Sequence, residues 1–83
     1  MVKVYGTMQC PDCVTMKEIF DEKGIEYKFF NIDDIRVLKR FLKLRDSEDA
    51  FDAARKEGQI GIPCIIREDK TVTLDYKAFA EEN

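Results

Sequence analysis

Residues 2–20 read VKVYGTMQCPDCVTMKEIF, and the junction inside this stretch sets the topology of the rest of the chain. VKVY (2–5) is a short alternating run with β-branched residues, which predicts a strand, and residues 6–9 form a loop. Pro11 suits the first position of a helix, where its missing N–H group would be unpaired anyway. Gly24 is expected to end that helix as a left-handed cap. Between Pro11 and Gly24, apolar residues recur at helical spacing and form one face, which consists of Cys13, Met16, Ile19 and Phe20.

The middle of the chain predicts one strand and two helices. Residues 25–32 (IEYKFFNI) form the strand, and Asp33 and Asp34 can cap the helix after it. Two consecutive helices are expected at about 34–46 and 47–57, with a break near Asp46, and one bent helix is the alternative. Ser47 is expected to cap the second of them, and Gly58 to close it. The expected apolar faces are Ile35, Leu38, Phe41, Leu42 and Arg45 in the first helix, and Ala50, Phe51 and Ala54 in the second.

The last part of the chain predicts a hairpin and a short helix. GIPCIIR (61–67) is expected to be a strand with Pro63 at its start, because proline fits strand beginnings and edges. Residues 68–70 form a turn, and 71–74 return as a fourth strand. Asp75 can cap a final helix whose inward side chains are Tyr76, Phe79 and Ala80.

The predicted element order is β-α-β-α-α-β-β-α, which is an α/β fold. A β-α-β start requires a right-handed crossover and two parallel strands, whereas the turn at 68–70 makes the last two strands antiparallel. We therefore expect a four-stranded mixed sheet flanked by helices on both faces, in a single domain over residues 1–83.

Composition excludes several classes of function. The 83 residues carry a net charge of −3, which argues against general nucleic-acid binding. No apolar run approaches the roughly 18 residues of a membrane span, and the start MVKVYG lacks a secretory signal, so we expect a cytoplasmic protein. Three cysteines do not suggest a disulfide framework, and without histidine a metal site would need cysteine or carboxylate ligands.

The C-x-x-C pair suggests thiol chemistry. Cys10 is expected at the N-terminus of a helix, where free N–H groups and a dipole worth at most about 2 kcal/mol favour a negative sulfur. Cys13 comes one turn later on the same face, so Cys10 is the expected attacking thiol and Cys13 the resolving one. The alternatives are two buried structural cysteines, or half of a zinc site, for which the chain has only one further cysteine.

YGTMQCPDC, the amphipathic helix and strand after it, and Ile62-Pro63 before a hairpin together resemble the glutaredoxin family of the thioredoxin superfamily. The resemblance implies a thioredoxin-like fold. It also implies that Pro63 is cis and faces the cysteines, and that the backbone of Ile62 pairs with the main chain of a substrate or of glutathione. The substrate-binding residues that it implies are Thr7, Met8, Gln9, Pro11, Ile62, Pro63 and Asp75.

The sequence departs from the family pattern in three places. Asp12 stands where many members have tyrosine, and its carboxylate is expected to make Cys10 ionise less readily. Thr7 stands where many have a lysine that binds a carboxylate of glutathione, and VTLDY (72–76) replaces a Gly-Gly-x-Asp stretch. Asp75 can still cap the last helix, whose free N–H groups could hold a carboxylate. These changes leave open whether glutathione is the partner.

Two further features have alternative interpretations. Cys64 is expected in the core, but it could instead be a third redox thiol or a third soft metal ligand. A basic helix face could hold the carboxylates of glutathione or an acidic protein, or it could simply be solvated. Its members are Arg36, Lys39, Arg40 and Lys43.

The sequence as a whole indicates a monomeric, glutaredoxin-like thiol–disulfide oxidoreductase that reduces protein or glutathione mixed disulfides. It needs no resident cofactor, and its electron donor is glutathione, as a cosubstrate, or a reductase protein. A metal or iron–sulfur carrier that uses Cys10, Cys13 and Cys64 is the first alternative. A redox sensor whose helix at 47–57 docks a partner is the second.

Overall fold

Four strands form one mixed sheet in the computed structural model, which describes residues 1–83. The strand order is β2-β1-β3-β4, in which β1 (Val2–Gly6) runs parallel to β2 (Tyr27–Asn31). It runs antiparallel to β3 (Cys64–Ile66), which pairs antiparallel with β4 (Val72–Thr73). The predicted α/β architecture, a four-stranded mixed sheet flanked by helices, is confirmed and is consistent with a thioredoxin-like fold.

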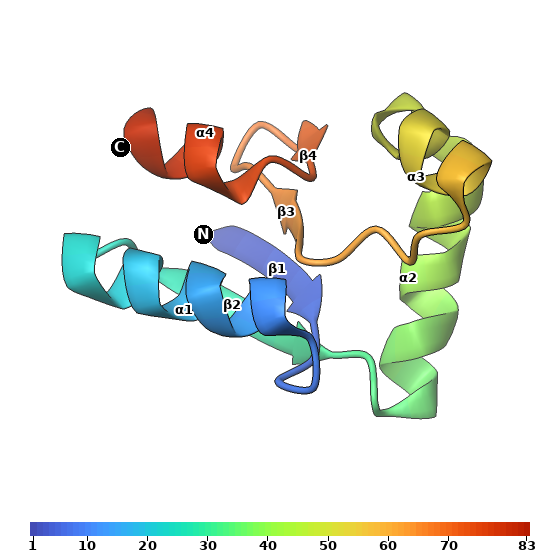
Figure 1. Ribbon diagram of the computed structural model, residues 1–83, viewed down its shortest axis with the longest axis horizontal. Coiled ribbons are helices and arrows are strands. Elements are labelled where there is room, and N and C mark those ends of the chain that lie inside the picture. The colour runs from blue at the N-terminus through green and yellow to red at the C-terminus, as the bar shows by residue number, and fades with distance from the viewer.

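The helices cover the two faces of this sheet. Figure 1 shows α1 (Pro11–Lys23) and α4 (Tyr76–Glu81) together on one side, and α2 (Ile35–Ser47) and α3 (Asp52–Glu57) on the other. Each side has its own apolar core. The core under α1 and α4 contains Val4, Met16, Phe20, Ile65, Phe79 and Ala80, and the core under α2 and α3 contains Tyr5, Phe41, Phe51 and Cys64.

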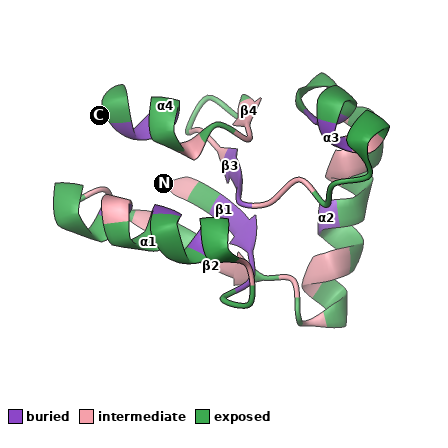
Figure 2. Cartoon of the chain, viewed as in Figure 1, coloured by how far each residue is buried: buried purple, intermediate pink, exposed green.

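Strand alternation separates the two cores. Val4 and Tyr5 are neighbours in β1, and Cys64 and Ile65 are neighbours in β3, yet the members of each pair belong to opposite faces. Figure 2 shows the buried residues concentrated on the central strands and on the helix sides that face them. Burial on both faces holds the carboxyl end of β1, and therefore the start of α1, in place.

Helix α1 begins and ends as predicted. Cys10 is its N-cap residue, Pro11 is its first residue, and Gly24 ends it in the left-handed conformation with φ 70°. Cys13, Met16 and Phe20 are its buried residues, so the apolar face expected from the spacing is the face that meets the sheet.

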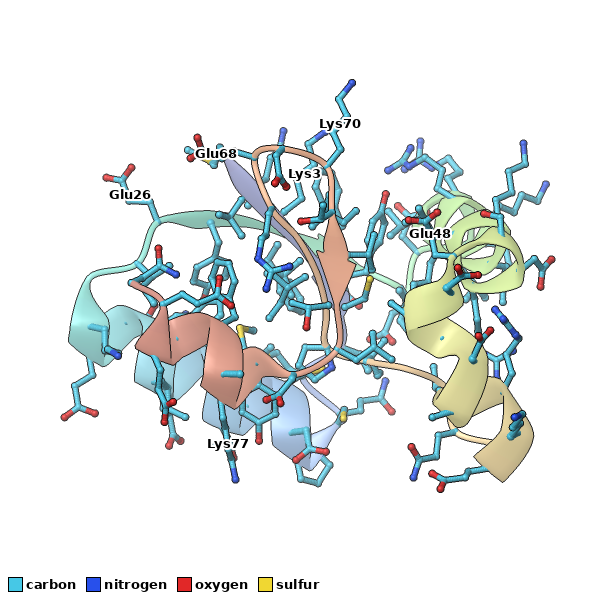
Figure 3. All side chains as sticks on the ribbon, turned by 90° about the horizontal axis from the view of Figure 1, so that it is seen from above. Lys3, Glu26, Glu48, Glu68, Lys70 and Lys77 are labelled. Carbon is cyan, nitrogen blue, oxygen red and sulfur yellow. The ribbon has the colours of Figure 1, made fainter.

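The segment after β2 forms two helices, as predicted, but the break comes at Glu48 rather than near Asp46. Figure 3 shows Glu48 at this junction. The expectation that Ser47 caps the second helix is wrong: Ser47 is the last residue of α2, and its hydroxyl donates to the carbonyl of Lys43 at 2.9 Å. A 3₁₀ turn, Asp49–Phe51, leads instead into α3.

The predicted inner face of α2 is partly wrong. Phe41 is buried and Leu38 packs beside it, but Ile35 and Leu42 are 64% and 44% exposed. Val37 and Leu44 occupy the inner positions instead. Ile35 and Leu42 are seven residues apart and share an outer face, so apolar content alone did not show the orientation of the helix. In the next segment Phe51 and Ala54 are buried as expected, whereas Ala50 is exposed.

The last two strands are shorter than predicted. The expected strand 61–67 pairs only over Cys64–Ile66, and the expected strand 71–74 only over Val72–Thr73. Pro63 has no N–H group to donate, so pairing starts after it. The Ile62–Pro63 bond is cis, as expected, and Asp75 caps α4 by accepting from the Ala78 N–H at 3.0 Å. None of the helices could cross a lipid bilayer, as each is too short or too polar.

Candidate active site

Cys10 lies at the point where the loop after β1 enters α1. The loop is tightened by its own hydrogen bonds: the Cys10 N–H donates to the Thr7 carbonyl at 3.1 Å, and the Gln9 N–H donates to the Thr7 hydroxyl at 3.2 Å. Cys10 is half-buried, and its sulfur makes no capping hydrogen bond with the first turn of the helix. The thiol therefore stands beside the unpaired N–H groups of a helix N-terminus.

Cys13 lies one turn further along α1 and is completely buried. Burial raises the pKa of its thiol to about 12, and the nearby charges of Cys10 and Asp12 act in the same direction, against a hydrogen bond from the Thr7 backbone. At neutral pH the Cys13 thiol is therefore protonated. The two cysteines have the unequal environments that an attacking and a resolving thiol require.

Gly6, the last residue of β1, makes room for the Cys13 sulfur. A Cβ atom at this position would lie 2.7 Å from Cys13 Sγ and 3.3 Å from the ring of Phe29. Sequence reasoning placed Gly6 only in a loop. The sequence signal for it was a glycine directly after a strand, which often marks a close approach of another group to the backbone.

Cys10 opens into a cavity of about 800 Å³. Among the predicted substrate-binding residues, Thr7, Gln9, Ile62 and Pro63 line this cavity together with Cys10. Met8 is 43% exposed and does not line it, and neither does Pro11. Asp75 lines a second cavity, of about 500 Å³, which shares Asp12, Gln59, Leu74 and Tyr76 with the first.

The segment 58–61 forms a wall of this cavity that sequence reasoning missed. Arg45 of α2 holds it: its Nε donates to the Ile60 carbonyl at 3.0 Å, and its Nη2 donates to the Gln59 carbonyl at 2.6 Å. The sequence did contain a signal, since Arg45 is a cation on the expected apolar face of its helix. Its partners are 14 and 15 residues away, so the pattern could not identify them.

Two aspartates, Asp12 and Asp33, line the cavity together with Cys10. Asp12 accepts from the Tyr76 hydroxyl at 3.2 Å, and Asp33 accepts from the Gln9 side-chain amide at 3.2 Å. Desolvation raises the pKa of the Tyr76 phenol, and the Asp12 carboxylate adds to the effect. Tyr76 was expected only to pack inward. It does contact the core beneath α4, but its hydroxyl faces the site.

Cys64 is separate from the other two cysteines. It is fully buried in the core under α2 and α3, and burial raises the pKa of its thiol to about 12, with Glu48 adding to the shift. No three cysteine or carboxylate side chains in the chain converge on a point where a metal ion could bind. The ligand set of the metal-carrier alternative, Cys10, Cys13 and Cys64, is therefore not brought together.

The basic face of α2 does not reach the cavity, since none of its four members lines it. Arg36 pairs with the Asp34 carboxylate at 3.0 Å, and the guanidinium of Arg40 lies 5.8 Å from the centre of the Phe30 ring. The carboxylates of a ligand in the cavity would find no arginine or lysine on its wall.

Comparison with known proteins gives two findings. Residues 2–72 match the family described as Glutaredoxin. A protein of Haemophilus influenzae that bears the name "Uncharacterized protein" is 34% identical over 67 residues, which are 80% of this chain and 78% of that protein. No solved structure matches the chain. The matched range contains all three cysteines and the Ile62-Pro63 pair, but it ends before Tyr76.

Proposed function

Since the chain belongs to the glutaredoxin family, we propose that it is a thiol–disulfide oxidoreductase that reduces protein or glutathione mixed disulfides with Cys10 and Cys13. One observation carries the proposal. Cys10 lies at a helix N-terminus on the wall of an open cavity, and Cys13 lies buried one turn below it. This is the arrangement in which one sulfur can capture a disulfide and the other can release it.

The reaction has two exchange steps. In the first, the Cys10 thiolate attacks one sulfur of the substrate disulfide, so that a Cys10–substrate disulfide forms and the other substrate sulfur leaves as a thiolate. In the second, Cys13 loses its proton and attacks Cys10 Sγ, which releases the remaining substrate sulfur and leaves a Cys10–Cys13 disulfide. Two electrons pass from the protein to the substrate, and the released thiolates take protons from water.

The order of the two cysteines follows from their environments. Cys10 lines the cavity and can meet a substrate sulfur, whereas the Cys13 sulfur is buried and has a pKa near 12. The backbone of Ile62, next to the cis peptide bond on the cavity wall, is the proposed partner for the main chain of the substrate.

The oxidised protein is reset by two electrons from a thiol donor. We propose glutathione or a reductase protein for this role, in the cytoplasm, with no resident cofactor. Either donor would reduce the Cys10–Cys13 disulfide by the reverse sequence of exchanges.

The test is turnover of a glutathione mixed disulfide of a neutral peptide by the wild type, Cys10→Ser and Cys13→Ser, with either glutathione or a thioredoxin-type reductase as donor. Cys10→Ser should be inactive, and Cys13→Ser should accumulate a mixed disulfide on Cys10 that mass spectrometry detects. Cys64→Ala is the matched control and should keep activity, since Cys64 lies outside the cavity. Full activity of Cys10→Ser would overturn the proposal.

A further inference from the structure

The cavity beside Cys10 has an unbalanced charge. Among its 14 lining residues are two carboxylates, Asp12 and Asp33, and no lysine or arginine. The adjoining cavity adds one carboxylate, Asp75, and one cation, Lys77, so the two together still carry a negative excess. A substrate that enters from solvent therefore meets an acidic wall.

Both carboxylates are held in place by neutral donors. Asp12 Oδ1 is 3.2 Å from the Tyr76 hydroxyl, and Asp33 Oδ2 is 3.2 Å from Gln9 Nε2. Neither residue belongs to an ion pair within the chain, whose paired acids are Asp21, Asp34, Asp52, Glu68 and Glu82. Their charges are thus fixed near Cys10 without a compensating cation.

The chemistry at Cys10 increases the need for a cation. Attack by a thiolate on a disulfide spreads negative charge over three sulfur atoms, and two carboxylates nearby oppose that charge. A positive group on the substrate would offset this opposition most strongly in the transition state. A negative group on the substrate would add to it.

We infer that the cavity selects disulfides flanked by lysine or arginine in a protein or peptide, and disfavours anionic disulfides. This inference rests on the proposed function and names its substrate class. Glutathione carries two carboxylates and one ammonium group, so its mixed disulfides should react, but more slowly than those of basic peptides. A volume of about 800 Å³ leaves room for the side chains on both sides of the attacked cysteine.

The test compares three symmetric peptide disulfides, Ac-X-Cys-X-NH₂, in which X is Lys, Gln or Glu. The reduced protein is mixed with each peptide under single-turnover conditions, and the freed peptide thiol is measured after an acid quench. Each rate is divided by the rate at which dithiothreitol reduces the same peptide disulfide. This division corrects for differences in the intrinsic reactivity of the three disulfides. The normalised rate should be about tenfold higher for the Lys peptide than for the Glu peptide at low salt, and the ratio should fall in concentrated NaCl.

Variants identify the groups responsible. Asp12→Asn and Asp33→Asn should each lower the Lys-to-Glu ratio, and the double variant should bring it close to one. Glu26→Gln removes the same charge from an exposed position between α1 and β2 and should leave the ratio unchanged (Figure 3). Circular dichroism checks the fold, and the salt dependence of the wild type shows, without any substitution, whether the preference is electrostatic.

The outcomes separate this inference from the proposed function. Equal normalised rates for the three peptides, with activity still dependent on Cys10, would overturn the charge selection and leave the oxidoreductase intact. A ratio that Glu26→Gln lowers as much as Asp12→Asn and Asp33→Asn would also overturn it, because the net charge of the protein would then be responsible. Absence of any reaction that depends on Cys10 would overturn the function itself.

Discussion

At the scale of single residues, Cys10 and Cys13 are three positions apart and lie in opposite environments. Cys10 is the N-cap residue of α1 and lines a cavity, whereas Cys13 packs against the glycine that ends β1. Residues three positions apart lie on the same face of a helix. Cys10 lies at the exposed start of α1, whereas Cys13 lies one turn further along, where this face packs on the sheet. Each position therefore suits one of the two exchange steps.

Gly6→Ala should damage the site through the Cys13 sulfur. The new methyl group would lie 2.7 Å from Cys13 Sγ, so the free energy of unfolding should fall by about 1–3 kcal/mol, as is typical of an overpacked core. Urea denaturation measures this change. In a Cys13→Ala background the same substitution should cost less, and an equal cost in both backgrounds would show that the sulfur is not the cause.

The second exchange step should depend steeply on pH. Only the thiolate of Cys13 attacks, and burial, the largest cause of its raised pKa, persists when Cys10 is in a mixed disulfide. The rate of release should therefore rise about tenfold per pH unit from about pH 6 to about pH 9. The symmetric disulfide of thionitrobenzoate measures this rate. Attack by Cys10 releases the first thionitrobenzoate in a fast phase, and attack by Cys13 releases the second in a slow phase. Cys13→Ser should lack that phase, and a flat profile would contradict the raised pKa.

At the scale of elements, α2 and the segment 58–61 are connected by side chains that join distant parts of the chain. Arg45 bonds the carbonyls of Gln59 and Ile60, and Arg55 of α3 donates to the carbonyls of Arg45 and Glu48 and to the Asp52 carboxylate. α3 is thus joined to the end of α2, and α2 holds one wall of the cavity through Arg45. The helix predicted at 47–57 therefore supports the cavity wall through its contact with the end of α2.

Arg45→Ala should loosen that wall. It removes two charge-assisted hydrogen bonds from a partly exposed position, so we expect a loss of about 1 kcal/mol in the free energy of unfolding. KM for a peptide disulfide should rise more than kcat falls, because this segment lines the cavity proposed to bind the substrate and contains no reacting group. Lys39→Ala, an exposed cation on the same helix, is the control. Equal effects of the two substitutions would rule out a specific role for Arg45.

At the scale of the whole molecule, the sheet carries a buried thiol on each face. Cys13 lies on the buried side of α1 on one face, and Cys64 of β3 lies under α2 and α3 on the other. The pKa of each is raised from its usual value of 9.0 to about 12. The folded protein therefore holds two protons more tightly than the unfolded chain does above about pH 9.

Stability of the reduced protein should fall in alkaline solution. A raised folded-state pKa stabilises the protein fully below the unfolded value, and that contribution is lost as pH rises from about 9 toward about 12. Urea denaturation in the presence of a reductant at a series of pH values measures the decline. Cys64→Ala should show a shallower decline than the wild type. An identical slope in both proteins would contradict the raised pKa of Cys64.

The features that the amino-acid pattern predicted correctly are local ones. The strand–helix junction, Cys10 at the N-cap, the left-handed glycine after α1 and the Asp75 cap each depend on residues within a few positions of one another. The mixed sheet could be predicted because chirality leaves few ways to connect such elements. The cis Ile62–Pro63 bond came from family resemblance alone.

Contacts between residues far apart in the chain had to come from the folded structure. Asp12 meets Tyr76 across 64 positions, and Arg45 reaches the loop before Pro63. Such contacts depend on how each helix is rotated on the sheet, and the exposed Ile35 and Leu42 show that apolar content did not specify that rotation for α2. Rotation is set by packing of the whole core, so a local pattern can place the two cysteines but cannot place the charges around them.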